Sequence, residues 1–286
     1  MRAVLTRLGL VVCGLFLGIA LLEGVLQAAA AWNGWSLRPT GTGRADAARR
    51  ILAVGDSNTF GLYLRREEAY PAQLAKRLPD ASVTNAGDPG MNSSRVRAIL
   101  PSLLAETKPT DVLILVGVND IWTVPEGDPL VRRPWWVHLR TARVVYQVWW
   151  WFHVPPSDVA HIAEDHSPML VGDAVFDVGW RVTSTLDPAL VAHTLDNLRS
   201  MVAAVREVGA RPWFLTYASG TPIYALASNP LRSVATEVGV PLIDLGAAML
   251  ARCGRCEDVF FGDGHPNAAG YAIVADVVAK ALARPE

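Results

Sequence analysis

Length, composition and charge limit the class of protein that this chain can be. It has 286 residues, of which 51% are hydrophobic and 19% are charged, so it can bury one large core or two small ones. Its formal net charge of −1 gives no electrostatic reason to expect nucleic acid as a partner. The histidines show neither Cys₂His₂ nor His-Glu-x-x-His spacing, so the sequence indicates no metal site.

The beginning of the chain differs in composition from the rest. Residues 8–32 are apolar and carry a single acid, Glu23, and a membrane-spanning helix needs about 20 such residues. Arg2 and Arg7 precede this stretch, so the positive-inside rule places the N-terminus in the cytoplasm and the bulk of the chain in the periplasm or at the cell surface. We therefore predict an uncleaved signal anchor over residues 1–32. A cleaved signal peptide is the alternative, because the stretch ends in small alanines.

Residues 33–48 contain Gly, Pro and polar residues and indicate a linker. Strands and helices then alternate. We expect strands at about residues 50–54, 82–85, 111–116, 212–217 and 241–244, and helices at about 69–78, 93–106, 188–209, 230–238 and 268–282. This alternation predicts an α/β domain over residues 49–286, a flavodoxin-like three-layer α/β/α sandwich with a five-stranded parallel sheet.

An insertion at about residues 121–185 interrupts this alternation. Tryptophans cluster between Trp122 and Trp151, with arginines interleaved. Large aromatic side chains usually indicate burial or an interface. Three interpretations stay open: a lid or substrate wall beside the site, an amphipathic helix resting on the membrane, or an extra helix packed on the core.

Cys253 and Cys256 form a Cys-Gly-Arg-Cys motif near the end of the chain. A zinc site would need two further ligands at suitable spacing, and none stands out. The motif favours a small structural disulfide, or two plain thiols in a reducing compartment.

Residues suited to nucleophilic catalysis follow the first expected strand and precede the last expected helix. Ser57 ends the sequence Gly55-Asp-Ser, where an α/β sheet exposes side chains at the carboxyl ends of its strands. A free hydroxyl is a poor nucleophile at neutral pH and needs a base. His265 is the best candidate for that base, and Asp263 could orient its imidazole.

Two further turns offer hydrogen-bond donors for a developing oxyanion. Gly90 lies in the turn after the second strand and can present its backbone N–H, and Asn119 follows the third strand with a side-chain amide. The backbone N–H of Ser57 would be a third donor.

In their order along residues 50–284, these four motifs resemble those of the SGNH or GDSL-type hydrolases. The resemblance implies a serine esterase with Ser57 as nucleophile, His265 as base and Asp263 as orienting acid. It also implies an oxyanion hole made by Ser57, Gly90 and Asn119, and no cofactor or metal. Many family members place the acid three residues before the histidine, where this chain has Gly262. Here the acid, Asp263, lies two residues before the histidine, a spacing that resembles that of the branch that acetylates or deacetylates exopolysaccharides. Asp258 is the alternative candidate for the acid.

We accordingly expect a membrane-anchored hydrolase that cleaves an ester through an acyl-enzyme on Ser57. The substrate would carry a short acyl group, such as an O-acetyl group on a cell-envelope glycan, or would be a lipid. An O-acyltransferase using the same acyl-enzyme is the first alternative, and a non-catalytic module that binds a glycan or a partner protein is the second. The sequence leaves the natural substrate and the oligomeric state open.

Overall fold

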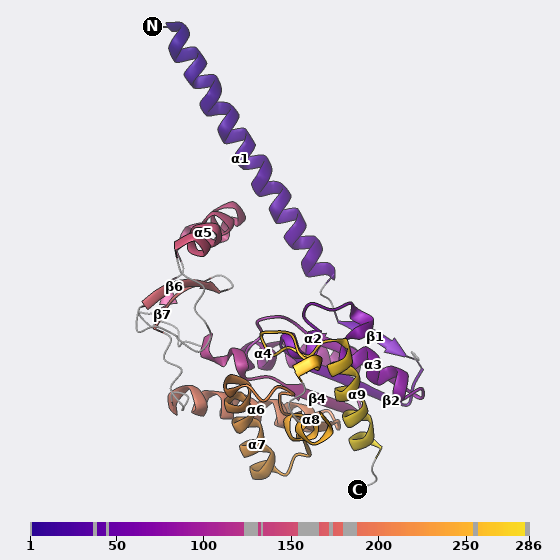
Figure 1. Ribbon diagram of the computed structural model, residues 1–286. Coiled ribbons are helices and arrows are strands. Elements are labelled where there is room, and N and C mark those ends of the chain that lie inside the picture. Colours follow the sequence, from indigo (N-terminus) through magenta and orange to yellow (C-terminus); the bar gives the residue numbers. More distant parts are fainter. Residues whose placement is uncertain are drawn as a thin grey trace. The chain divides into compact units, whose positions relative to one another are not determined.

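The computed structural model describes residues 2–36, 39–43, 46–122, 131–132, 134–153, 166–171, 174–179, 188–253 and 257–283. The chain divides into two compact units, and Figure 1 labels many of their helices and strands. We call residues 39–123 with 185–286 the sheet unit, and residues 1–38 with 124–184 the tryptophan-rich unit.

The sheet unit contains the six-stranded sheet of the molecule. Its strands are β1 (Thr40–Gly43), β2 (Arg49–Gly55), β3 (Ala81–Gly87), β4 (Asp111–Leu115), β8 (Arg211–Leu215) and β9 (Leu242–Ile243). They follow the order β1-β3-β2-β4-β8-β9, and all neighbours are parallel except β1 with β3. The predicted parallel α/β sheet is therefore confirmed, with β2, β3, β4, β8 and β9 as its expected strands.

The sixth strand, β1, comes from the segment that the sequence indicated as linker. Its sequence is Thr-Gly-Thr-Gly, and three of its four residues are exposed. It pairs with β3 and so forms the edge strand of the sheet. Because it buries no apolar side chain, no hydrophobic pattern marks it in the sequence.

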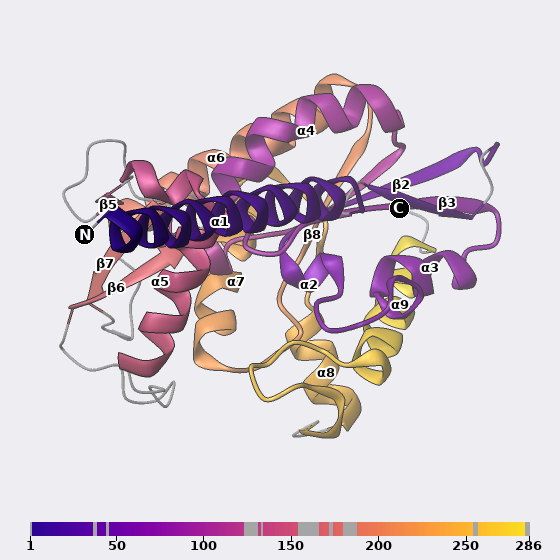
Figure 2. The ribbon, with the colours of Figure 1, turned by 90° about the horizontal axis from the view of Figure 1, so that it is seen from above.

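Helices cover both faces of this sheet, as Figure 2 shows. The helices are α2 (Ser57–Phe60), α3 (Tyr70–Arg77), α4 (Ser93–Thr107), α6 (Pro188–Glu207), α7 (Pro222–Val238), α8 (Leu245–Cys253) and α9 (Ala268–Leu282). The 3₁₀ helices η1 (Arg66–Glu68), η2 (Val118–Trp122) and η4 (Glu257–Val259) lie between them. α3 and α9 pack together with α8 on one face, and α4, α6 and α7 pack together on the other. The three-layer sandwich is thus confirmed.

Helix α7 starts earlier than the sequence suggested. We expected this helix at about residues 230–238. The helix instead begins at Pro222, and Pro230 lies inside it. Ala227, Leu231 and Val234 are buried along α7, and this tertiary packing outweighs the local cost of an internal proline.

Three turns lie next to one another at the carboxyl ends of the central strands β2, β3 and β4. Gly55 at the end of β2 pairs with Gly87 of β3 and with Leu115 of β4. A Cβ on Gly55 would lie 2.1 Å from the carbonyl oxygen of Leu115, so the close approach of these strands requires glycine. The turns that follow β2, β3 and β4 therefore leave the sheet side by side.

The tryptophan-rich unit consists of α1 and part of the insertion. Its elements are α1 (Arg2–Ser36), β5 (Val131–Arg132), η3 (Trp135–His138), α5 (Arg140–His153), β6 (His166–Val171) and β7 (Ala174–Gly179). The strands form a separate antiparallel sheet in the order β5-β7-β6. Within the described part of the chain, one helical segment, Arg2–Ala29, is long and apolar enough to cross a membrane. Cys256 and the side chain of Cys253 lie outside the described residues, and so does the predicted disulfide.

Candidate active site

A tight strand–turn–helix positions Ser57. β2 ends at Gly55, and α2 begins at Ser57, with Asp56 as its N-cap. The Asp56 carboxylate accepts a hydrogen bond from the backbone N–H of Asn58 at 2.8 Å. Ser57 is thereby held at the first position of α2, where it is 7% exposed.

The serine, histidine and aspartate that the sequence singled out lie in a row. The Ser57 Oγ atom is 2.8 Å from Nε2 of His265, and Nδ1 of His265 is 2.9 Å from Oδ2 of Asp263. The other Asp263 oxygen accepts the backbone N–H of His265 at 3.1 Å. Asp258, the alternative candidate for the acid, is exposed, and its carbonyl oxygen accepts a hydrogen bond from the Asn267 side chain. The geometry thus brings Asp263, two residues before the histidine, to the imidazole.

Tyr63 is a contact of this row that the sequence analysis missed. Its hydroxyl donates to Oδ2 of Asp263 at 3.0 Å, and its ring lies edge-on to His265 with centroids 5.8 Å apart. Partial burial opposes ionisation of Asp263, but the backbone N–H and ring of His265 and the Tyr63 hydroxyl outweigh it and lower the pKa of Asp263. Asp263 is therefore ionised at neutral pH. Tyr63 is far from Asp263 in sequence, so no local pattern could link them.

A second tyrosine, Tyr224, also contacts the imidazole. Its hydroxyl is 3.5 Å from Nδ1 of His265, and the two rings meet edge-on with centroids 6.1 Å apart. Burial raises the pKa of Tyr224, so this phenol stays neutral. His265 thus makes edge-on contacts with two tyrosine rings, Tyr63 and Tyr224, which restrict its orientation.

Asp56 and Tyr217 connect the Ser57 turn to the turn that carries Asn119. Asp56 is fully buried, and its Oδ2 accepts a hydrogen bond from the Tyr217 hydroxyl. The same hydroxyl accepts the backbone N–H of Val118 at 2.9 Å. Burial raises the pKa of Asp56 to about 6, although hydrogen bonds from Tyr217 and Asn58 act in the other direction.

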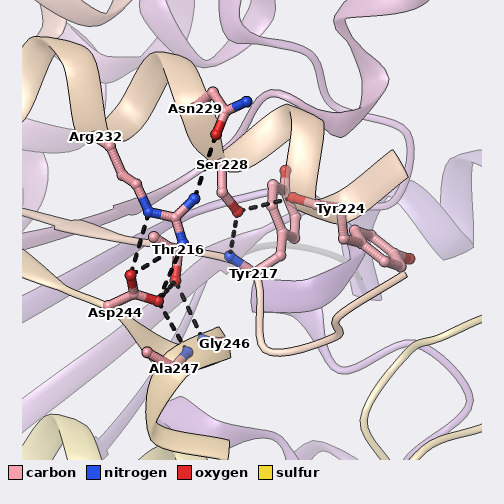
Figure 3. A network of polar contacts seen from close by, with 9 residues as sticks. All are labelled: Thr216, Tyr217, Tyr224, Ser228, Asn229, Arg232, Asp244, Gly246 and Ala247. Atoms are coloured by element: carbon pink, nitrogen blue, oxygen red, sulfur yellow. Dashed lines mark hydrogen bonds and ion pairs between the residues drawn. The ribbon is translucent and has the colours of Figure 1, made fainter. Parts of the chain in front are cut away.

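Polar contacts of α7, drawn in Figure 3, hold Tyr217 and Tyr224 in place. The Ser228 hydroxyl donates to the carbonyl oxygen of Tyr224 at 2.8 Å and accepts the backbone N–H of Tyr217 at 3.1 Å. Arg232 forms an ion pair with Asp244 at 3.0 Å and so fastens α7 to the segment after β9. α7 thus holds Tyr224, which contacts His265, and Tyr217, which contacts Asp56.

The two expected oxyanion turns also meet. Gly90 has a φ of 77°, and a Cβ there would meet nothing within 4 Å, so this glycine is required by the backbone conformation alone. The Asn119 side-chain amide donates to the carbonyl oxygen of Met91 at 3.0 Å. Asp120 accepts the backbone N–H of Ser93 at 2.7 Å, which fastens the same two turns a second time.

Known proteins with similar sequences are esterases and acylhydrolases. The model of the GDSL-like Lipase/Acylhydrolase family matches residues 53–273. Esterase TesA of Pseudomonas aeruginosa is 44% identical over 78 residues, which are 26% of this chain and 39% of that protein. Thioesterase 1/protease 1/lysophospholipase L1 of Escherichia coli strain K12 is 39% identical over 80 residues, 28% of this chain and 38% of that protein. The matched segments therefore span less than half the length of these relatives.

Solved structures show the same fold. The crystal structure of TesA superposes with a TM-score of 0.52 at 22% identity and covers 82% of this chain and 98% of TesA. An acetylxylan esterase from Geobacillus stearothermophilus superposes with a TM-score of 0.52 at 17% identity, covering 84% of this chain and 96% of that one. The family match over residues 53–273 confirms the predicted resemblance, and the structural superpositions agree with it. The chain belongs to the GDSL-like lipase/acylhydrolase family.

Proposed function

We propose that this protein is a serine esterase that forms an acyl-enzyme on Ser57. The observation that carries the proposal is the row of contacts from Ser57 Oγ to His265 Nε2 at 2.8 Å and from His265 Nδ1 to Asp263 Oδ2 at 2.9 Å. A hydroxyl in contact with an imidazole that is itself oriented by a carboxylate is the arrangement that activates serine for attack on a carbonyl.

The first half of the reaction follows from these positions. Nε2 of His265 takes the proton of Ser57 as Oγ bonds to the ester carbonyl carbon, and Asp263 stabilises the imidazolium that forms. His265 then gives this proton to the leaving alkoxide as the carbon–oxygen bond breaks. Water, activated by the same imidazole, attacks the acyl-enzyme in the second half and releases the acid and free Ser57.

The negative charge on the carbonyl oxygen needs donors that are already in position. We assign them to the backbone N–H groups of Ser57 and Gly90 and to the Asn119 side-chain amide. The hydrogen bonds that fasten the Gly90 and Asn119 turns together support this role, since they limit reorganisation during the reaction. The buried Tyr217 hydroxyl supports it too, because it joins Asp56 beside the nucleophile to Val118 beside Asn119.

For the substrate we propose an ester of a short acyl group on a cell-envelope glycan or a lipid. The similar proteins are named as an esterase, a thioesterase and lysophospholipase, and an acetylxylan esterase. We also propose that α1 spans the membrane from about Leu8 to Ala29, within the apolar segment Arg2–Ala29, with Arg2 and Arg7 on the cytoplasmic side and the sheet unit outside. Cell fractionation tests this: release into the soluble periplasm with a mature N-terminus near Trp32 would refute the anchor.

Ser57→Ala tests the enzymatic proposal, and the chain offers a matched control. Ser94 also contacts a histidine, with its Oγ 2.7 Å from Nε2 of His193, but on the outer helices α4 and α6. With the full chain in detergent and p-nitrophenyl acetate as substrate, Ser57→Ala should lose roughly 10⁴-fold or more in kcat. Ser94→Ala should keep the wild-type rate. Equal rates in wild type and Ser57→Ala would refute the esterase and favour a binding module.

An O-acyltransferase would use the same acyl-enzyme, with a sugar hydroxyl in place of water. Adding an acceptor glycan to the p-nitrophenyl acetate assay separates the two activities. We expect free acetate as the main product. Acetylated glycan as the main product would assign transfer instead.

A further inference from the structure

The helix α5 carries an exposed apolar face that belongs to the tryptophan-rich unit. Val145, Val148, Trp149 and Phe152 follow the i, i+3, i+4, i+7 spacing of one helical face. Their residues are 68%, 47%, 46% and 77% exposed, and Val144 beside them is 50% exposed. Next to this face, the Tyr146 ring packs on η3: its centroid is 5.2 Å from that of Trp136 and 5.9 Å from that of Trp149. α5 thus contacts η3 through Tyr146 and still exposes much of its valine and aromatic surface.

Hydrogen bonds tie the first turn of α5 to α1 through Glu23. One Glu23 oxygen accepts the backbone N–H of Arg140 at 3.0 Å, and the other accepts the backbone N–H and hydroxyl of Thr141 at 2.8 and 2.9 Å. Gln27, one turn further along α1, donates to Glu23 and to the carbonyl oxygen of His138. The carboxylate caps the positive end of the α5 dipole, which accounts for the single acid inside the apolar stretch of α1.

The position of Glu23 along the proposed span sets the depth of this contact. A helix rises about 1.5 Å per residue, so Glu23 lies about 23 Å beyond Leu8, the first residue after the basic end. In a hydrocarbon core of about 30 Å, it would lie about 7 Å below the far boundary. Amphipathic helices in a membrane interface bury their apolar faces by about 5–10 Å. The depth of the Glu23 contact therefore matches the depth of an interfacial helix.

The composition of α5 indicates the same surroundings. The helix contains two arginines and no acidic residue, together with tryptophan, tyrosine and phenylalanine. Aromatic residues gather at membrane–water interfaces, and cationic residues favour the surface of anionic lipids. Trp135 of η3, just before α5 in the chain, is a further exposed aromatic residue of this unit, at 76% exposure.

We propose that α5 is an interfacial helix that lies in the lipid surface on the extracytoplasmic side of the membrane, with Glu23 of α1 fixing its first turn. The occupant of the exposed face is the lipid bilayer. This inference goes beyond the esterase and rests on the proposed span of α1. The hydrolytic activity can fail its test without affecting it.

Labelled full-length protein in vesicles tests the proposal. In a background of Cys13→Ser, Cys253→Ser and Cys256→Ser, single Val145→Cys and Phe152→Cys variants carry an environment-sensitive fluorophore. The vesicles contain phosphatidylcholine, phosphatidylglycerol and lipids with a nitroxide near the headgroup or deep in the chain. We expect blue-shifted emission at both sites and stronger quenching by the shallow nitroxide. A Leu15→Cys label should be quenched most by the deep nitroxide.

Controls separate the span from the interfacial helix. Val208, a valine of the sheet unit that is 54% exposed, carries the label as Val208→Cys and should report water. Water-like emission at Val145 and Phe152 while the Leu15 label is quenched would overturn the proposal and leave the span intact. Shielding from water without quenching would assign the face to a protein partner or a second copy. Quenching at Val208 equal to that at Val145 would show non-specific adsorption and also overturn the proposal. An unquenched Leu15 label would remove the span and the inference together.

Glu23→Gln tests the contact that fixes α5. It removes the charge at the helix end, and we expect the ratio of docked to undocked α5 to fall roughly fivefold, equivalent to about 1 kcal/mol. The Val145 label should lose quenching accordingly while the Leu15 label is unchanged. An unchanged Val145 signal would refute the role of Glu23.

Discussion

The choice between Asp263 and Asp258 as orienting acid can be decided with one pair of variants. Asp263→Asn removes the charge that lies 2.9 Å from Nδ1 of His265. At an effective dielectric constant of about 20, this charge stabilises an imidazolium by about 6 kcal/mol. Since the Asp263 side chain is 42% exposed, solvent screens part of it, and about 2–4 kcal/mol remains. We therefore expect kcat to fall roughly 30- to 1000-fold.

Steady-state hydrolysis of p-nitrophenyl acetate measures this loss. KM should change little, because Asp263 acts when the imidazole becomes charged and not when the ester binds. Asp258→Asn is the matched control and should keep the wild-type kcat. A loss below about threefold in Asp263→Asn, together with a large loss in Asp258→Asn, would show that the assignment to Asp263 is wrong.

Three further outcomes follow from the same site. Tyr63→Phe removes the hydroxyl that donates to Asp263 but keeps the ring beside His265. The kcat should therefore fall only about 3- to 10-fold, in line with about 0.5–1.5 kcal/mol for one hydrogen bond. A 100-fold loss of kcat would show that Tyr63 does more than orient Asp263. In Gly90→Ala the added Cβ meets no atom, but alanine is forced to a φ of 77°, so kcat should fall about 5- to 30-fold for about 1–2 kcal/mol of strain. The kcat of Gly90→Asn should fall less. Equal kcat values in wild type, Gly90→Ala and Gly90→Asn would contradict the strain argument. The pKa of Asp56 is raised to about 6 in the folded protein, so folding favours the protonated carboxyl, and its contribution to stability is present at low pH and is lost as the pH rises through about 6. The melting temperature of wild type relative to that of Asp56→Asn should therefore fall between pH 4 and 7. Melting temperatures that change in parallel over this range would refute the shift.

Local chemistry made the framework of this protein predictable. The apolar run before Gly55-Asp-Ser predicted a buried strand that ends in a turn, and β2 ends there, with Ser57 starting α2. The final helix begins at Ala268 as predicted, and the Asn267 side chain caps it. Parallel strands place their carboxyl ends at one edge, so the expectation that Ser57 and His265 lie close together followed from topology.

Tertiary structure decided the contacts made by residues far apart in the chain. Tyr63 reaches Asp263, and Tyr217 joins Asp56 to Val118, because folding brings separate elements together and no spacing in the sequence records it. The edge strand β1 was missed for a related reason, since it pairs through backbone atoms that every residue possesses. Glu23 shows the same limit: in the sequence it is an isolated acid in an apolar stretch, and only the fold supplies the helix end that it caps. Local patterns thus indicated the central strands, most of the helices and the reactive side chains of this protein, whereas long-range packing determined the edge strand and the groups that hold the reactive side chains in place.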